Sequence, residues 1–362
     1  MSARPAMRKV LSFIAVLGAN LIAVVIGAGA FLGRRAWNAD PLAITAPPGI
    51  DEGRYVQIGG IDQWIQIRGQ NVDNPVVLFL HGGPGAPLLP YSRLFQPWEK
   101  EFTVVQWDQR GAGRSLAASG DAIAESMSIE RMTEDGIEVA RYLRGRLHKD
   151  RIVLLGLSWG SILGIRMIRE HPELFAAYVG TGQVTNMIET AALIHRLCLE
   201  RARAAGNDEA VNALEALGPP PYETWDRIIV HYKWRDALLR PESERVALSS
   251  LEQVMQTAPG FSPGDIRDWD RGFRRIPSLA LYRAMDSTDL LALGTQFSVP
   301  VFFFEGMDDL DTPASLVRAY FDAITAPRKE YVPLEGGHIV LLTAPDKFLT
   351  ELVTRVRPLA TP

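Results

Sequence analysis

A serine framed by two glycines, in the segment Gly156-Leu157-Ser158-Trp159-Gly160, has the spacing of a nucleophile held on a sharp turn. The apolar run at residues 152–157 has the length of a buried parallel strand, and the apolar residues after the serine are spaced as on one face of a helix. Glycines at 156 and 160 remove side chains that would collide at such a strand-to-helix turn. The start of the helix directs backbone amides and its dipole toward the serine. We therefore predict that Ser158 is a nucleophile for acyl transfer.

A serine hydroxyl is too weak an acid to attack a carbonyl unaided, so it needs a base within hydrogen-bond reach and a third group that orients the base. Of the six histidines, His338 follows a late predicted strand on a Gly-Gly loop, from which it can reach Ser158. His81 lies in an earlier glycine loop, which we expect it to fix by hydrogen bonds. The loop after the strand predicted at residues 299–304 supplies three candidates for the orienting acid, namely Asp308, Asp309 and Asp311.

The negative charge that develops on the substrate oxygen needs hydrogen-bond donors. We expect an oxyanion hole formed by the backbone amide of Trp159, the residue after the nucleophile, and by the amide of Gly83 in the glycine loop. The alternative for that loop is a tight turn without a role in binding. Cys198 is the only cysteine, which excludes an intrachain disulfide and a cysteine-based metal cluster. The predicted chemistry needs no metal and no organic cofactor.

Alternating strand and helix patterns place these residues at one edge of a predicted sheet. Two strand patterns separated by Gly59-Gly60 predict an antiparallel hairpin. The later strands alternate with helical segments, which predicts an α/β fold with a mostly parallel sheet and helices on both faces. The predicted strands are residues 54–58, 61–68, 75–80, 103–107, 152–157, 176–180, 299–304 and 329–333.

The alternation stops over residues 183–285, where the pattern is helical and amphipathic. We interpret this insertion as a helical lid, or cap, over the carboxyl edge of the sheet, where the sites of such folds lie. The alternative is a separate helical domain without a role in the site. Residues 51–182 and 286–362 are accordingly predicted to form the catalytic domain.

The N-terminal part of the chain has the pattern of a membrane anchor. Residues 10–32 carry no charge, are long enough to span a bilayer as a transmembrane helix, and have basic residues on both sides. The alternative is a cleaved signal peptide, which would make the protein secreted. The charge balance favours an extracytoplasmic catalytic domain. We predict an anchor or signal sequence over residues 1–35, a linker over residues 36–50, and the membrane as a partner.

The composition of the 362 residues is that of a globular protein, with 47% hydrophobic and 22% charged residues. The formal net charge is −4, and no basic face with interleaved aromatic residues is visible. Nucleic acid is therefore not expected as a partner, and the predicted ligand is a small molecule.

The chain contains three motifs: His81-Gly82-Gly83-Pro84-Gly85, Asp108-Gln109-Arg110-Gly111-Ala112-Gly113-Arg114-Ser115 and Gly156-Leu157-Ser158-Trp159-Gly160-Ser161. With the order and spacing between them, these motifs resemble the prolyl aminopeptidase (proline iminopeptidase) branch of the α/β hydrolases. The resemblance implies the α/β-hydrolase fold, in which the nucleophile, the acid and the histidine follow one another along the chain. It covers roughly residues 50–180 and 295–355 and fades across the cap.

The resemblance also ranks the three candidate acids. The family has a Gly-x-x-Asp pattern followed by Thr-Pro, which matches Gly306, Asp309 and the pair Thr312-Pro313. Asp309 is therefore the first choice for the acid, ahead of Asp308 and then Asp311.

By resemblance, the chain is a serine hydrolase with Ser158, His338 and Asp309 as its triad, which cleaves small peptides or amides as an aminopeptidase through an acyl-enzyme. Glutamates of the family's lid bind the free α-amine of the substrate, and Glu189 falls near one such position. The rest of the lid shows no convincing match, with Trp225-Asp226 and Trp234-Arg235-Asp236 as loose candidates for the family's aromatic-acid pair. A carboxylesterase or lactonase with the same machinery therefore stays open. A non-catalytic binding protein is the third hypothesis, disfavoured because every catalytic position holds a competent residue.

Overall fold

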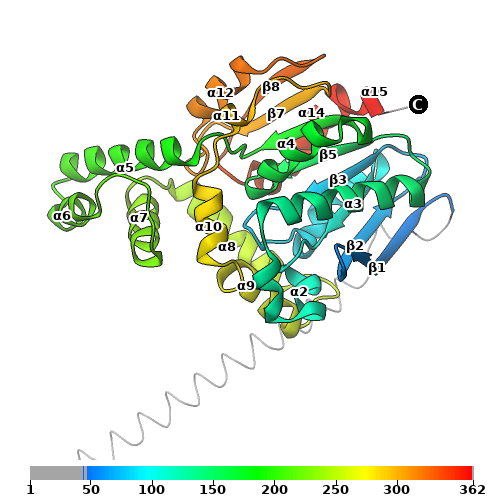
Figure 1. Ribbon diagram of the computed structural model, residues 1–362, viewed down its shortest axis with the longest axis horizontal. Coiled ribbons are helices and arrows are strands. Elements are labelled where there is room, and N and C mark those ends of the chain that lie inside the picture. Colours follow the sequence, from blue (N-terminus) through cyan, green and yellow to red (C-terminus); the bar gives the residue numbers. More distant parts are fainter. Residues whose placement is uncertain (1–43, 45–46, 361–362) are drawn as a thin grey trace, which may run out of the picture.

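The computed structural model describes residue 44 and residues 47–360. Their centre is an eight-stranded sheet with the order β1-β2-β4-β3-β5-β6-β7-β8, flanked by helices on both faces (Figure 1). The mostly parallel sheet predicted from the strand and helix patterns is confirmed. Its strands are β1 (Ile50–Ile58), β2 (Ile61–Gly69), β3 (Val76–Leu80), β4 (Thr103–Trp107), β5 (Ile152–Leu157), β6 (Phe175–Thr181), β7 (Val301–Gly306) and β8 (Lys329–Leu334).

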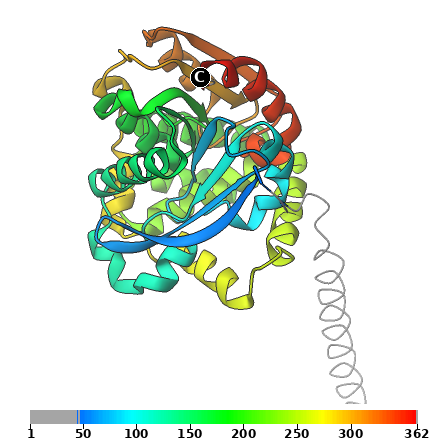
Figure 2. The same cartoon turned by 90° about the vertical axis from the view of Figure 1, so that its right-hand side faces the viewer.

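The hairpin of β1 and β2 forms one edge of the sheet, which faces the viewer in Figure 2. At its turn, Gly59 and Gly60 have φ angles of 56° and 78°, which residues with a Cβ rarely adopt. β2 also pairs antiparallel with β4, and all later pairs are parallel. Strands β3 to β7 are buried throughout, as apolar runs are in a sheet covered on both faces.

Two layers of helices cover the sheet. One face carries α3 (Ile129–Leu147), α4 (Trp159–Glu170) and α12 (Ala314–Ala323), and the other carries η1 (Leu89–Lys100) and α14 (Pro345–Arg355). Side chains of one strand alternate between the two cores: Leu78 packs in the first, and its neighbours Val77 and Phe79 pack in the second. The loops at the carboxyl ends of the strands therefore have a rigid base. The shorter elements are α2 (Gly113–Ser119), η2 (Asp121–Ser126), η3 (Pro172–Leu174), α13 (Val340–Thr343) and α15 (Arg357–Ala360).

Between β6 and β7 the chain leaves the sheet and forms a cap of helices. These are α5 (Met187–Ala204), α6 (Asp208–Leu217), α7 (Trp225–Leu238), α8 (Glu242–Gln256), α9 (Pro263–Arg274), α10 (Leu279–Asp286) and α11 (Leu290–Leu293). Helices α5, α6 and α7 extend away from the sheet (Figure 1) and share a core around Cys198 and Trp234. The cap occupies the predicted place of the helical insertion, and its predicted domain boundaries, residues 183–285, stay a prediction.

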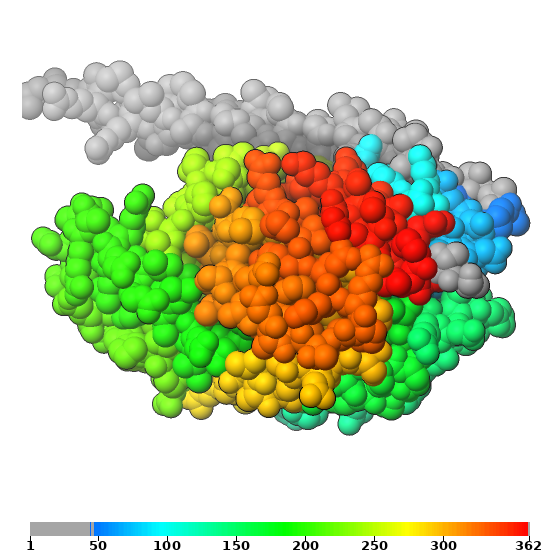
Figure 3. Space-filling model, turned by 90° about the horizontal axis from the view of Figure 1, so that it is seen from above, coloured from blue at the N-terminus to red at the C-terminus, as the bar shows by residue number. Residues whose placement is uncertain are grey.

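The C-terminal part of the chain lies between the cap and the hairpin edge. Figure 3 shows the residues coloured orange to red, from β7 to α15, in the middle of one face of the molecule. Helices α5 and α6 (green) lie at one end of this face, and the N-terminal strands (blue and cyan) lie at the other. The loop after β7 contacts α7 through the pair of Asp311 and Arg235, and the loop after β8 contacts α8 where Gly337 lies against Glu244.

Within residue 44 and residues 47–360, no helix is long and apolar enough to cross a membrane. The longest of these helices, α3, has 19 residues and carries charged side chains along its length. The segment predicted to span the membrane, residues 10–32, lies outside the described residues. The predicted fold class is therefore corrected: the α/β-hydrolase fold with its cap stands, and the N-terminal transmembrane helix is not supported. The same correction applies to the predicted membrane-anchored location and to the membrane as a partner.

Candidate active site

Ser158 lies between β5 and α4 with φ 53° and ψ −120°, a strained conformation for a residue with a side chain. Its flanking glycines leave no room for a side chain. A Cβ at Gly160 would lie 2.1 Å from the carbonyl oxygen of Leu80, and a Cβ at Gly156 would lie 2.8 Å from the carbonyl oxygen of Gly160. The Ser161 hydroxyl donates to the Ser158 carbonyl at 2.6 Å and holds the turn. The sharp turn predicted from the glycine spacing is therefore present.

The glycine loop after β3 is fixed by His81, which is buried. Nε2 of His81 accepts from the Gln109 amide at 3.1 Å, so Nδ1 carries the proton and donates to the Gly82 carbonyl at 2.8 Å. Burial lowers the pKa of His81 to about 4, which keeps its ring neutral at physiological pH. The Gln109 side chain accepts from the indole of Trp159 at 3.1 Å and joins this loop to the turn at Ser158.

The two predicted oxyanion donors lie beside the nucleophile. The backbone of Gly82 approaches Ser158 so closely that a Cβ there would lie 3.3 Å from the Ser158 Cβ. Gly83, with φ 119°, lines the same cavity as Ser158 and Trp159. Within residues 47–360, neither the Gly83 amide nor the Trp159 amide has a hydrogen-bond acceptor. Both amides are therefore available to a ligand, and their role as oxyanion donors stays a prediction.

Asp309 is buried in the loop after β7, and four donors hold its carboxylate. Oδ1 accepts from the amides of Asp311 at 2.7 Å and Thr312 at 2.8 Å. Oδ2 accepts from the Thr312 hydroxyl at 2.7 Å and from Nδ1 of His338 at 2.9 Å. Asp308 is exposed. Of the three candidate acids, Asp309 is the one that hydrogen-bonds His338.

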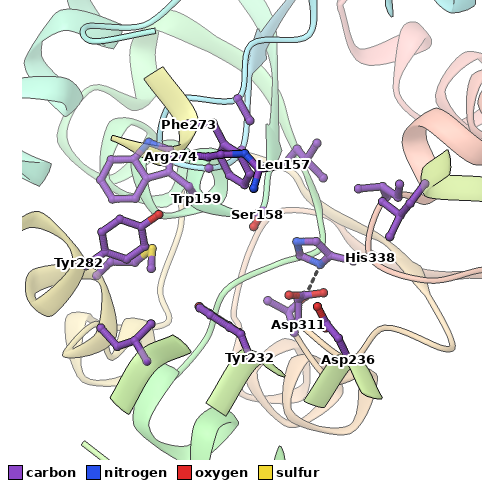
Figure 4. A pocket seen from close by; sticks show the side chains of 18 of the residues that line it. Leu157, Ser158, Trp159, Tyr232, Asp236, Phe273, Arg274, Tyr282, Asp311 and His338 are labelled. Carbon is purple, nitrogen blue, oxygen red and sulfur yellow. Dashed lines mark hydrogen bonds between the residues drawn. The ribbon is translucent and has the colours of Figure 1, made fainter. Parts of the chain in front are cut away.

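The histidine and the serine lie on the same side of the cavity. Figure 4 shows the Ser158 hydroxyl and the His338 ring facing each other, with Asp311 beyond the ring. The ring packs against the backbone of Gly182, where a Cβ would lie 2.8 Å from the Cε1 atom of His338. In the part of the chain that the structure describes, the Ser158 hydroxyl has no hydrogen-bond partner. Such bonds are often long in a free enzyme and shorten when substrate binds.

Carboxylates surround the His338 ring. Burial disfavours its charged form, but the charges of Asp309 and Asp311 outweigh burial and raise the pKa of His338 to about 9. A third acid, Glu305 at the end of β7, is fully buried nearby, and burial raises its own pKa well above the ordinary value. Glu305 accepts from the Gln183 amide at 3.2 Å and holds the loop against which His338 packs.

These groups open onto a cavity of about 1060 Å³ between the sheet edge and the cap. Ser158, Trp159 and His338 lie in its wall, together with side chains from α5, α7, α8, α9 and α10. A cavity of this size holds a ligand of the dimensions of a short peptide. The side chain of Glu189 is exposed in the first turn of α5 and does not line the described wall of the cavity, so its role in amine binding stays a prediction.

Three residues of this site were not predicted from the sequence. Thr312, whose hydroxyl donates to Asp309, belongs to the Thr-Pro pair of the family pattern. That pair was used only to rank the candidate acids. Asp286 of α10 and Arg235 of α7 both line the cavity, and they had no signal, because a polar residue on an amphipathic helix is usually solvated. Burial raises the pKa of Asp286 to about 6.

The sheet order, the strained serine turn and the cap define the class of this protein, the α/β hydrolases. The sequence profile described as the alpha/beta hydrolase fold matches residues 75–197, which include β3, β5 and the serine turn. The chain is a hydrolase of this class.

Similar proteins place it within the class. The probable aminopeptidase YbaC of Bacillus subtilis (strain 168) is 31% identical over 314 residues, which cover 84% of this chain and 96% of the relative. A proline iminopeptidase of Neisseria meningitidis serogroup A is 37% identical over 307 residues, or 78% of this chain and 89% of the relative. The chain belongs to the proline iminopeptidase branch of the α/β hydrolases.

A solved structure agrees at the level of the fold. The proline iminopeptidase-related protein of Thermus thermophilus matches 86% of this chain and 99% of its own, with a TM-score of 0.59. The sequence identity is 20%, so this likeness supports the fold alone.

Proposed function

We propose that the chain is a serine hydrolase that removes the N-terminal residue of short peptides or related amides through an acyl-enzyme. The observation that carries this proposal is the fixed His338–Asp309 pair, with Nδ1 2.9 Å from Oδ2, beside a serine on a strained turn in the same cavity. The relatives named as an aminopeptidase and a proline iminopeptidase support the choice of substrate.

Each group has a defined part in the proposed reaction. Nε2 of His338 takes the hydroxyl proton of Ser158 as its oxygen attacks the substrate carbonyl. Asp309 holds the ring by Nδ1 and stabilises the imidazolium. The amides of Trp159 and Gly83 donate to the oxyanion. The imidazolium then protonates the leaving amine, and water deacylates Ser158 by the same route in reverse.

An aminopeptidase must also bind the α-ammonium group of its substrate, and we propose Asp286 for this role. Asp286 lines the cavity and is half-buried, and among the described residues it has no cationic or hydrogen-bonding partner. Its raised pKa of about 6 leaves the carboxylate charged at pH 7 and above. A buried charge without a partner is costly, and a bound ammonium group would remove that cost.

The other acids of the cavity are less suited to bind an ammonium group. Asp236 and Asp311 are both paired with Arg235, and Asp270 is paired with Arg274 at 2.7 Å. Glu252 is exposed. Among the described acids of the cavity, Asp286 is thus the one that is partly buried and has no cationic partner.

The test compares three substrates built on the same amino acid: an aminoacyl-naphthylamide with a free amine, its N-acetylated form, and the corresponding naphthyl ester. Asp286→Asn is expected to lower kcat/KM by about 10- to 100-fold for the free amine only, which is the worth of one charge-assisted hydrogen bond. Asp270→Asn, which alters a paired acid of the same cavity, is the control. Ser158→Ala must abolish all turnover. Equal turnover of free and blocked amides would refute the aminopeptidase proposal.

An ester substrate is the second candidate, because apolar side chains of the cap form much of the cavity wall. Ile194 of α5 and Leu251 and Met255 of α8 line it and could hold an acyl chain. Serine-dependent turnover of p-nitrophenyl butyrate without turnover of any aminoacyl amide would favour this candidate. Asp286→Asn would then leave kcat/KM unchanged.

A further inference from the structure

A second carboxylate lies beside the proposed base. Oxygen atoms of Asp309 and Asp311 and a ring nitrogen of His338 all lie within 4.8 Å of one another. The Asp309 carboxylate is held by its own loop and by His338, as described above. The Asp311 carboxylate makes no hydrogen bond to the ring, and its side chain is about a quarter exposed at the cavity wall. His338 therefore faces two negative charges, of which Asp309 alone orients it.

The cap supplies the positive charge that pairs with Asp311. Arg235 of α7 is nearly buried, with 9% of its side chain exposed, and its Nη1 pairs with Oδ1 of Asp311. Nη2 of Arg240, in the segment between α7 and α8, lies 3.7 Å from Oδ2 of Asp311. Both arginines also pair with Asp236, at 2.8 and 2.9 Å. The contact between cap and acid loop is thus a charged one, made chiefly by Arg235.

The other charged groups around His338 come from the sheet and from α8. Glu305 is fully buried at the end of β7, near enough for its charge to act on His338. Glu244 of α8 lies against Gly337, where a Cβ would be 3.0 Å from the carboxyl carbon of Glu244. Glu244 is itself paired with Arg240 at 2.6 Å. Of these two arginines, Arg235 is the one in direct contact with the Asp311 carboxylate, and Arg240 is more distant.

We propose that Arg235 is a positioning residue that acts on His338 through Asp311, and that the contact of α7 with the acid loop favours the neutral, competent form of the base. The guanidinium compensates the second carboxylate, so the ring can release its proton at a lower pH and accept the one from Ser158. Without this contact Asp311 is left uncompensated, and Nε2 keeps its proton to a higher pH. The serine is then activated less at a given pH. The proposal rests on the role of His338 as base in the proposed function.

The experiment measures the rate at which a fluorophosphonate labels Ser158 in the full chain between pH 5.5 and 10.5. The rate rises with pH as His338 loses its proton. Arg235→Gln is expected to move the midpoint of this rise upward by about one pH unit, because one nearby positive charge is lost. Asp311→Asn is expected to move it downward by a similar amount, and Arg235→Lys to restore most of the wild-type midpoint.

A matched control is Arg203→Gln, which breaks an exposed ion pair of the cap with Glu215 and leaves the site untouched. Its midpoint should equal that of the wild type. Circular dichroism melting checks that each variant is folded, and Asp311→Asn and Arg235→Lys keep the test decisive if Arg235→Gln does not fold.

Two outcomes separate this inference from the proposed function. Rates lowered equally at every pH, with unmoved midpoints in the Arg235 and Asp311 variants, would show a merely structural ion pair and overturn the inference. Labelling that survives in Ser158→Ala would instead overturn the serine mechanism itself, whatever the midpoints.

Discussion

The loops after β3 and β8 carry the same three residue types in reverse order, His81-Gly82-Gly83 and Gly336-Gly337-His338. Both histidines lie next to the serine turn, but their surroundings differ in charge. His81 contacts backbone groups and an amide, and burial lowers its pKa to about 4. His338 is also buried, but it faces Asp309 and Asp311, which raise its pKa to about 9. One histidine is thereby suited to hold a loop and the other to accept a proton.

A glycine loop with a histidine therefore does not by itself define a base. What differs between the two loops is the set of acids that other elements bring to the ring, since β7 and the loop after it bring Glu305, Asp309 and Asp311 to His338 alone.

The largest effect is expected from His338→Ala, which removes the proposed base and should lower kcat by about 10⁴- to 10⁶-fold. The fold should persist, because the ring lies at the cavity wall. Steady-state kinetics measure kcat, and a thermal melt shows whether the variant is folded. If His338→Ala keeps more than about a tenth of wild-type kcat, its loss is no larger than that expected for His81→Gln, and His338 is not the base.

The next effect concerns stability at acid pH. His81 has a pKa of about 4 in the folded chain and about 6.5 in an unfolded one, so the unfolded state binds more protons between these values. The free energy of unfolding should fall by about 3 kcal/mol as the pH drops through this window. Urea titrations of the wild type and of His81→Gln should differ in this slope. Identical slopes would contradict a buried neutral ring.

His338 should show the opposite dependence on pH. Its pKa of about 9 means that the neutral, competent ring forms as the pH rises, so kcat/KM should increase about 50-fold between pH 7 and pH 9. Its contribution to stability is fully present below about pH 6.5 and is lost as the pH rises through 9. A pH–rate profile checks the first statement, and a rise centred near pH 6.5 would show that the acids do not act on the ring.

The smallest effect is that of His81→Gln on catalysis at neutral pH. The ring fixes the Gly82 and Gln109 backbones without touching the reacting atoms, so a change in loop position should lower kcat by about tenfold. The comparison with His338→Ala is direct when both are assayed with one substrate. Losses of equal size would mean that His81 takes part in the chemistry.

Much of the site could be predicted from the sequence, because its parts follow local rules. The collision at Gly160 depends on a strand-to-helix turn that the apolar pattern reveals. The positions of His338 and of three acids after late strands predict a pair of this kind, and the family resemblance selects Asp309, which hydrogen-bonds His338. Glu189 was placed by resemblance across the cap, where the likeness fades, and its side chain is exposed.

The sequence by itself determined the succession of strands and helices along the chain, the turn at Ser158 and the loops that carry the catalytic candidates. These features follow from backbone sterics and hydrophobic periodicity, which act over a few residues. The tertiary structure alone decided that Arg235 meets Asp311 and that Asp286 faces the cavity with no cation paired to it among the described residues. The Arg235–Asp311 pair and the position of Asp286 depend on residues far apart in the chain, and on the orientation in which the amphipathic helices of the cap pack over the sheet. The physical reason is that charge acts through space, whereas the pattern of a helix records only which of its faces is buried.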